Sequence, residues 1–193
     1  MTRISPLKKL TGGKLMSPFR RHVLRWENCQ KCLLCHCRQK VVIARGKIPA
    51  PILFIGEAPG DSEDTLGIPF CGPAGRLLDH FIREGFDGQH DYAMSNLVCC
   101  IPKDVANSKG EPPKEAIMAC APRLQEFIGL VKPKLIVTVG RLSDLWGPKI
   151  AVGYRGKWAS ILHPAAVLRM DASQQSLAIK RCIVTLSDAA TGL

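Results

Sequence analysis

Short apolar runs alternate along this chain with longer segments in which apolar residues recur at helical spacing. The runs predict strands at 51–55, 93–98, 135–139 and 158–162, with a short extended segment at 41–43. The helical spacing predicts helices at 17–28, 75–85, 114–130, 142–146 and 173–187. Continuous apolar strands separated by helices are typical of a parallel sheet that is buried on both faces. We therefore predict an α/β fold, a three-layer sandwich whose central four-stranded parallel sheet is flanked by helices.

Two prolines qualify the predicted helices. Ser17 and Pro18 suit the N-cap and first position of the first helix. Pro122 falls inside the helix at 114–130 and is expected to break or kink it.

Polar residues follow the predicted strands. Glu57, Asn96, Arg141 and His163 stand at or just after the strand ends. In an open parallel sheet, ligands bind at the carboxyl ends of the strands. We expect these side chains to converge on one pocket.

The loop from Gly56 to Gly75 reads GEAPGDSEDTLGIPFCGPAG. Its glycines and prolines suit a backbone that approaches a ligand closely. Its acids would repel a phosphate. Acids beside a single phenylalanine suit a pocket for a flat, neutral group whose reaction involves water or a developing positive charge. An ordinary strand-to-helix loop stays open as the alternative.

Composition places these elements in one domain. With 193 residues and 46% hydrophobic content, the chain can bury a real core. We expect a single domain at 17–193 after a basic arm at 1–16. The net charge is +11, and the first 25 residues carry no acid, which suits a polyanion; a solvated tail is the alternative. There is no membrane-length apolar run or secretory signal, so we expect a cytoplasmic protein without a membrane partner.

Nine cysteines are present: Cys29, Cys32, Cys35, Cys37, Cys71, Cys99, Cys100, Cys120 and Cys182. Their odd number and the lack of a secretory signal disfavour a disulfide framework. A metal or cluster site is the stronger interpretation.

From about residue 26 to 187 the sequence resembles the iron–sulfur uracil-DNA glycosylases, family 4 of that superfamily. The first motif of that family, GE-x-P-G-x-x-ED-x-x-G-x-PF-x-G-x-AG, stands at 56–75. The second, HP-x-x-x-LR, stands at 163–169. Ser95 to Val98 and the segment from Lys132 to Arg141 lie between them in the expected order. The resemblance implies a monomer that acts on DNA, from a prokaryotic or viral source.

The resemblance also implies a set of cluster ligands. It assigns a [4Fe–4S] cluster to Cys29, Cys32, Cys100 and Cys120. The cysteine spacing alone would equally allow zinc. Cys35 or Cys99 could replace one of the four.

The implied reaction is the hydrolysis of an N-glycosidic bond after a base is flipped out of the helix, with uracil as the expected base. Phe70 would stack on the base and Asn96 would pair with its edge. His163 would donate to the base oxygen on which negative charge grows.

Capture of the sugar cation by water requires an acidic side chain that positions the water. Ala58, part of the substrate pocket, stands where the best-known branch of the superfamily has a water-orienting aspartate. Water would therefore fall to Glu57, Glu63 or the backbone, with Glu57 favoured in the pocket and Glu63 as a supporting acid. DNA contacts are assigned to Val167, Leu168 and Arg169, with Leu168 filling the space of the flipped base.

Two regions depart from the family pattern. The segment from Gly140 to His163 is shorter than usual, and the loop at 101–107 differs. Both could widen the pocket, so release of a bulkier base, such as a hypermodified cytosine of viral DNA, is the first alternative. A non-catalytic DNA-binding protein on the same fold is the second. A covalent uracil trap is disfavoured, because the chain lacks the basic, histidine-tipped insertion of such a relative.

Overall fold

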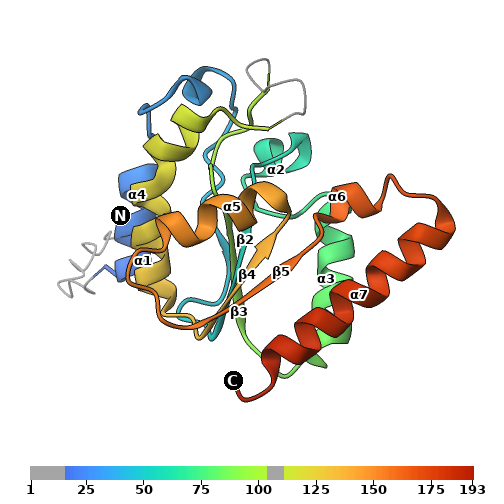
Figure 1. Cartoon of the computed structure of the whole chain (residues 1–193). Coiled ribbons are helices and arrows are strands. Elements are labelled where there is room, and N and C mark those ends of the chain that lie inside the picture. The colour runs from blue at the N-terminus through green and yellow to red at the C-terminus, as the bar shows by residue number, and fades with distance from the viewer. Residues whose placement is uncertain (1–15, 104–110) are drawn as a thin grey trace, which may run out of the picture.

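The computed structural model describes residues 16–103 and 111–193, and its centre is a twisted sheet between two layers of helices (Figure 1). The sheet has the strand order β1-β3-β2-β4-β5. Its strands are β1 (Arg45–Gly46), β2 (Ile52–Gly56), β3 (Tyr92–Asn96), β4 (Leu135–Val139) and β5 (Lys157–Ile161). The predicted arm at 1–16 lies outside the described residues except for Met16.

The four predicted parallel strands are present, and a fifth strand corrects the count. β1 pairs antiparallel with β3, while β2, β3, β4 and β5 pair in parallel. β1 has only two residues, so it has no alternating pattern that a sequence analysis could detect. The extended segment expected at 41–43 forms no strand.

The two faces of the sheet are covered by different helices (Figure 1). α4 (Lys114–Val131) and α5 (Arg141–Ile150) cover one face, and α1 (Pro18–Trp26) packs outside α4. α3 (Pro73–Phe86) and α7 (Ala172–Ala190) cover the other. The alternation within a strand follows from this: Leu53 joins the α4 side of the core and Phe54 the α3 side, and both are fully buried. The three-layer prediction is confirmed.

The first helix begins as its capping residues predict, whereas two other helices continue through prolines. The Oγ of Ser17 accepts from the amide of Arg20 at 3.2 Å, as expected for an N-cap. Pro122 does not break α4, which continues to Val131. A proline deprives the carbonyl four residues earlier of its donor; that residue, Met118, is 56% exposed, so water can replace the lost bond. α5 likewise extends through Pro148 and is longer than predicted.

Three short helical segments fall where loops were expected. They are η1 (Leu33–His36), α2 (Asp61–Leu66) and α6 (Pro164–Val167). η1 lies within the cysteine segment, whereas α2 and α6 follow β2 and β5 and lie beside the sheet's carboxyl edge. Within the described residues, the helices are too short or too polar to cross a bilayer.

Candidate functional site

A pocket of about 910 Å³ opens at the carboxyl ends of β2, β3, β4 and β5. The predicted strand-end residues converge there, as the parallel topology requires. Of the residues assigned to catalysis, base binding and DNA contact, the pocket is lined by Glu57, Ala58, Glu63, Phe70, Asn96, His163 and Arg169.

Phe70 and Asn96 form adjoining walls of this pocket over Gly56. β2 and β3 pair with Gly56 beside Asn96. A Cβ at Gly56 would collide with both the Phe70 ring and the amide oxygen of Asn96. Glycine is therefore needed at this position so that the ring and the carboxamide can approach each other.

The backbone of Phe70 is held in a strained conformation. Its φ of 54° lies in the left-handed region, which non-glycine residues rarely adopt. The Nη1 of Arg45 donates to the carbonyl of Phe70 at 3.1 Å, and Arg45 also pairs with Asp79. The missing side chain of Gly75 makes room for that same carbonyl. β1, which carries Arg45, thus supports the aromatic wall from behind.

Glu57 lies against the start of α5. Its Oε1 accepts from the amide of Leu142 at 2.9 Å. Burial raises the pKa of Glu57, and the hydrogen bond from Leu142 opposes that rise by stabilising the carboxylate. A Cβ at Gly140, whose φ is 98°, would crowd both Glu57 and His163. The absence of that side chain lets the acid and the imidazole share one side of the pocket.

The imidazole of His163 is arranged as a neutral donor. Its Nδ1 accepts from the amide of Ala165 at 3.2 Å, so the hydrogen of the neutral ring lies on Nε2. Burial, with a further contribution from Arg169, lowers the pKa of His163 to about 4. The ring is therefore uncharged at neutral pH.

Glu63 has a bracing role that its sequence position did not reveal. Its Oε1 accepts from the amide of Gly72 at 3.0 Å and its Oε2 from that of Gly60 at 3.2 Å. The two carboxylate oxygens thereby close the loop between β2 and α3.

The three residues assigned to DNA contact differ in exposure. Leu168 is 44% exposed and Arg169 is exposed, whereas Val167 is fully buried. Burial argues against a direct DNA contact by Val167; its side chain joins the core beneath α3 and α7. It anchors the turn that presents Leu168.

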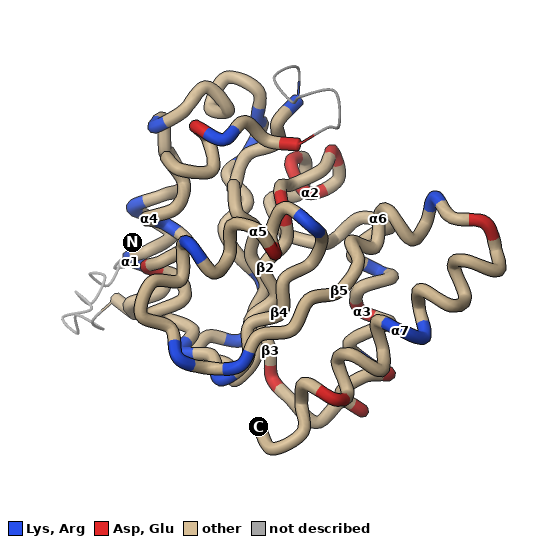
Figure 2. Tube along the Cα trace, in the orientation of Figure 1, with Lys and Arg blue, Asp and Glu red and all other residues tan. Residues whose placement is uncertain are grey.

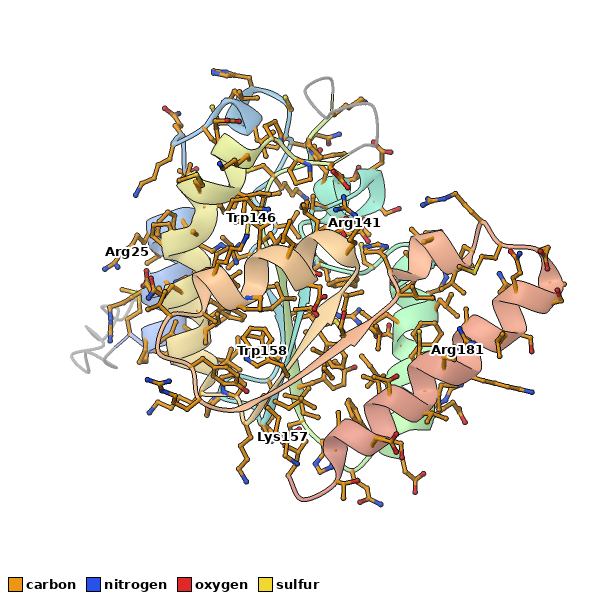
Figure 3. All side chains as sticks on the ribbon, viewed as in Figure 1. Arg25, Arg141, Trp146, Lys157, Trp158 and Arg181 are labelled. Carbon is orange, nitrogen blue, oxygen red and sulfur yellow. The ribbon has the colours of Figure 1, made fainter. Side chains whose placement is uncertain are left out.

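Arg141, the remaining strand-end residue that was expected to reach the pocket, lines it from the start of α5 and pairs with Glu111. Two further side chains with no predicted role also reach the pocket. Arg181 and Thr185 line it from α7. Figure 3 labels Arg141 and Arg181 on these two helices, and Figure 2 shows that acids gather on α2. The helical pattern of α7 could not identify Arg181, because nothing in that pattern distinguishes a pocket-facing arginine from a solvated one.

A second cavity, on the α4 side of the molecule, is lined by cysteines. Cys29, Cys32, Cys100 and Cys120 all line it, and Cys99 does as well. These thiols come from the segment after α1, the segment after β3 and the middle of α4, and none forms a disulfide. The four ligands that the resemblance implies therefore line one cavity, together with the alternative ligand Cys99.

The chemistry of this donor set fits a thiolate-bound metal group. Burial raises the pKa of the Cys100 thiol to about 12, so this sulfur becomes a thiolate only when a cation replaces its proton. Two arginines approach the sulfurs: Arg38 lies 3.6 Å from the Sγ of Cys100, and Arg123 lies 3.6 Å from that of Cys120. Within residues 16–103 and 111–193, no three histidine, cysteine or acidic side chains are gathered closely enough to hold a single ion.

A family model described as the uracil DNA glycosylase superfamily matches residues 43–186. The chain belongs to this superfamily. The matched segment contains every residue of the pocket described above, whereas Cys29 and Cys32 precede it.

The similar proteins are type-4 uracil-DNA glycosylases, which confirms the family-4 resemblance. That of Pyrobaculum aerophilum is 34% identical over 165 residues, which cover 76% of this chain and 82% of the relative. That of Archaeoglobus fulgidus is 31% identical over 166 residues, covering 73% and 78%. That of Saccharolobus solfataricus is 41% identical over 116 residues, covering 60% and 52%. The chain thus spans about half the length of the last relative, and 51% of the similar one from Sulfurisphaera tokodaii.

Proposed function

We propose that this chain is a monofunctional uracil-DNA glycosylase, which flips uracil out of DNA, hydrolyses its N-glycosidic bond and leaves an abasic site for base excision repair. The observation that carries the proposal is the convergence of Phe70, Asn96 and His163 beside Glu57 in one pocket. The names of the type-4 relatives support uracil as the base. Nothing in the comparisons supports the hypermodified cytosine or the non-catalytic alternative.

Base recognition would depend on two walls. The Phe70 ring offers an apolar face on which a flat base stacks, at a contribution of about 1–3 kcal/mol. The Asn96 carboxamide offers a donor and an acceptor side by side, which match the O4 and N3–H of uracil. Cytosine presents the opposite pattern of donor and acceptor at the same atoms, so the same amide orientation disfavours it.

Departure of the base would depend on His163. As the glycosidic bond breaks, negative charge accumulates on the pyrimidine ring and its O2. The Nε2–H of His163 is the ring donor left free by the Nδ1 contact to Ala165, and it can donate to that oxygen. A buried, preorganised donor of this kind contributes about 2.7–4 kcal/mol to the barrier.

Capture of the sugar cation would depend on Glu57 rather than Glu63. Both oxygens of Glu63 accept from loop amides, whereas among the described residues Glu57 accepts a hydrogen bond at Oε1 alone, from Leu142. Its negative charge stands at a helix N-terminus, which favours the ionised form that attracts a cation and orients water. Ala58 offers no acid for this task.

Contact with DNA would use the exposed turn after α6 and the basic rim of the pocket. Leu168 would occupy the space of the flipped base, and Arg169, Arg141 and Arg181 would hold phosphates. The net charge of +11 adds affinity that does not depend on sequence, so binding weakens steeply with salt.

The cysteine cavity would hold a [4Fe–4S] cluster through Cys29, Cys32, Cys100 and Cys120. The cysteine spacing alone would also allow zinc. The similarity to the type-4 relatives supports the four-iron group. When bound, the cluster would serve as a structural crosslink between three segments of the chain. The single domain, the monomeric state and the cytoplasmic location stay predictions.

The test is the release of free base from duplexes that carry uracil, cytosine, thymine or hypermodified cytosine. We expect uracil alone to be released, and Asn96→Ala to lose most of that activity while unfolding at the wild-type temperature. Failure to release uracil would sink the proposal, and release of the modified base instead would establish the bulkier-base alternative. A brown colour lost together with iron would identify the cluster, whereas a colourless, zinc-containing protein would contradict it.

A further inference from the structure

Arg123 is a buried cation between the cysteine cavity and the pocket, and it has no role in the proposed mechanism. It lies on α4, one helical turn after Cys120, and only 1% of its surface is exposed. Charged side chains are rarely fully buried without a partner, so this position needs an explanation.

The guanidinium of Arg123 forms hydrogen bonds with the end of β3 that carries Asn96. Its Nη1 donates to the Oγ of Ser95 at 2.6 Å. Its Nη2 donates to the carbonyl of Asn96 and, at 3.0 Å, to that of Leu97. The amide of Leu97 in turn donates to the carbonyl of Gly56 at 2.8 Å, which extends the pairing of β2 and β3 up to the pocket.

The same guanidinium faces a sulfur on its other side. Its Nη2 lies 3.6 Å from the Sγ of Cys120. Among the ion pairs of the described residues, none involves Arg123 with a carboxylate. A buried charge that meets only neutral carbonyls is costly, and an anionic partner offsets that cost. A cysteine that binds metal is a thiolate, so a metal-bound Cys120 would be such a partner.

We propose that Arg123 is a positioning residue that connects the cysteine cavity to the base pocket. A thiolate at Cys120 holds the guanidinium in place, and the guanidinium holds the carbonyls of Asn96 and Leu97. The Asn96 side chain is thereby aimed into the pocket. This inference rests on the proposed function for the role of the pocket. What it predicts is the rigidity of the end of β3.

The experiment measures amide hydrogen exchange at Leu97 and Val98, whose amides pair with the carbonyls of Gly56 and Glu57. The variants are Arg123→Met and, as a matched control, Arg38→Met. Arg38 contacts the Sγ of Cys100 and the carbonyl of Cys29, and within the described residues it makes no hydrogen bond to β3. Both variants therefore remove an arginine beside a cavity sulfur, but only one releases the strand end.

We expect Arg123→Met to speed exchange at these amides by about tenfold or more, the scale set by losing buried hydrogen bonds. Arg38→Met should leave it near the wild-type rate. Cys120→Ser, which removes the thiolate whatever metal is bound, should speed exchange in the wild-type background and add little to Arg123→Met. Equal rates in all variants, or fully additive effects of Cys120→Ser and Arg123→Met, would overturn the inference.

Two further measurements separate this inference from simpler outcomes. Arg123→Lys keeps the charge but offers a single nitrogen, so it should give an intermediate exchange rate and remains informative if Arg123→Met does not fold. In the uracil assay, Arg123→Met should discriminate less well between uracil and cytosine. The visible absorbance of the cluster in this variant should stay at the wild-type level. Because exchange is read without substrate, a chain that releases no uracil would refute the proposed function and still leave the coupling measurable.

Discussion

The pocket and the cysteine cavity are built in opposite ways. In the pocket, the polar side chains are held by backbone amides: Leu142 holds Glu57, Ala165 holds His163, and two loop amides hold Glu63. In the cavity, the sulfurs come from three distant segments and are approached by arginine side chains. Backbone donors preorganise a site before its ligand arrives, whereas thiols that gather from separate segments depend on their ligand to hold them together.

This difference predicts that substitutions in the cavity mainly lower the free energy of unfolding, whereas substitutions in the pocket mainly lower the rate of the reaction. Cys120→Ser should have the largest effect, lowering the free energy of unfolding by about 3–5 kcal/mol, because it leaves the buried Arg123 without its anionic partner. Chemical denaturation would measure the loss. Cys37→Ser is the matched control: Cys37 does not line the cavity and donates to the carbonyl of Leu33. Equal losses in the two variants would contradict the assignment.

The complementary change in the pocket is His163→Gln. It should lower kcat about 10²–10³-fold, since it removes the donor to the base oxygen, and change the unfolding temperature little at pH 7. Single-turnover release of uracil would measure the chemical step. Val184→Ala, on an exposed position of α7, should match the wild type. A large rise in KM at unchanged kcat would assign His163 to binding instead.

DNA affinity offers a finer distinction between the two regions. Arg181→Ala should weaken binding several-fold and reduce the salt dependence by about one ion. Lys180→Ala removes the same charge from the neighbouring position, which is exposed and does not line the pocket, and should do less. Lys31→Ala asks whether the cavity side also contacts phosphates, because Lys31 lines the cavity and lies 4.6 Å from the Trp26 ring centre. Titrations at several salt concentrations would rank the three; a larger loss for Lys180→Ala than for Arg181→Ala would move the interface away from the pocket.

At neutral pH the smallest effect concerns the charge of His163, which changes stability only in acid. The folded-state pKa of His163 is about 4, below the usual 6.5, so the unfolded chain binds more protons between these values. The contribution of the neutral ring to stability is complete above pH 6.5 and falls by at most about 1.4 kcal/mol per pH unit down to pH 4. His163→Gln lacks this group, so its stability should fall less over the same range. If the free energies of unfolding of the wild type and of His163→Gln changed with pH in parallel, the ring would not be buried as described.

Much of the fold was predictable because its signals are local. The apolar runs of β2 and β4 and the helical spacing of α3 require no knowledge of distant neighbours. β1 escaped prediction because two residues carry no period, and α4 continues through Pro122, which lies on the exposed side of the helix. The site residues were predictable where they end strands, since parallel topology brings strand ends together.

The supporting residues were not predictable, because their roles exist only across the fold. Arg45 supports the carbonyl of Phe70 from 25 positions away, and Arg123 reaches the carbonyl of Asn96 from 27 positions away. Both are ordinary arginines in the sequence. Val167 shows the reverse case, since its motif suggested contact with DNA while the packing against α3 and α7 buries it.

By itself, the sequence determined the α/β class, the order of the strands' polar ends and the presence of a glycine-rich acidic loop, because hydrophobic period and backbone permissiveness are properties of neighbouring residues. Only the tertiary structure decided which acid keeps an uncommitted carboxylate oxygen, which histidine nitrogen carries the hydrogen, and which arginine connects the cysteines to the pocket. Those properties depend on desolvation and on hydrogen-bond partners that the folded chain brings together from distant positions.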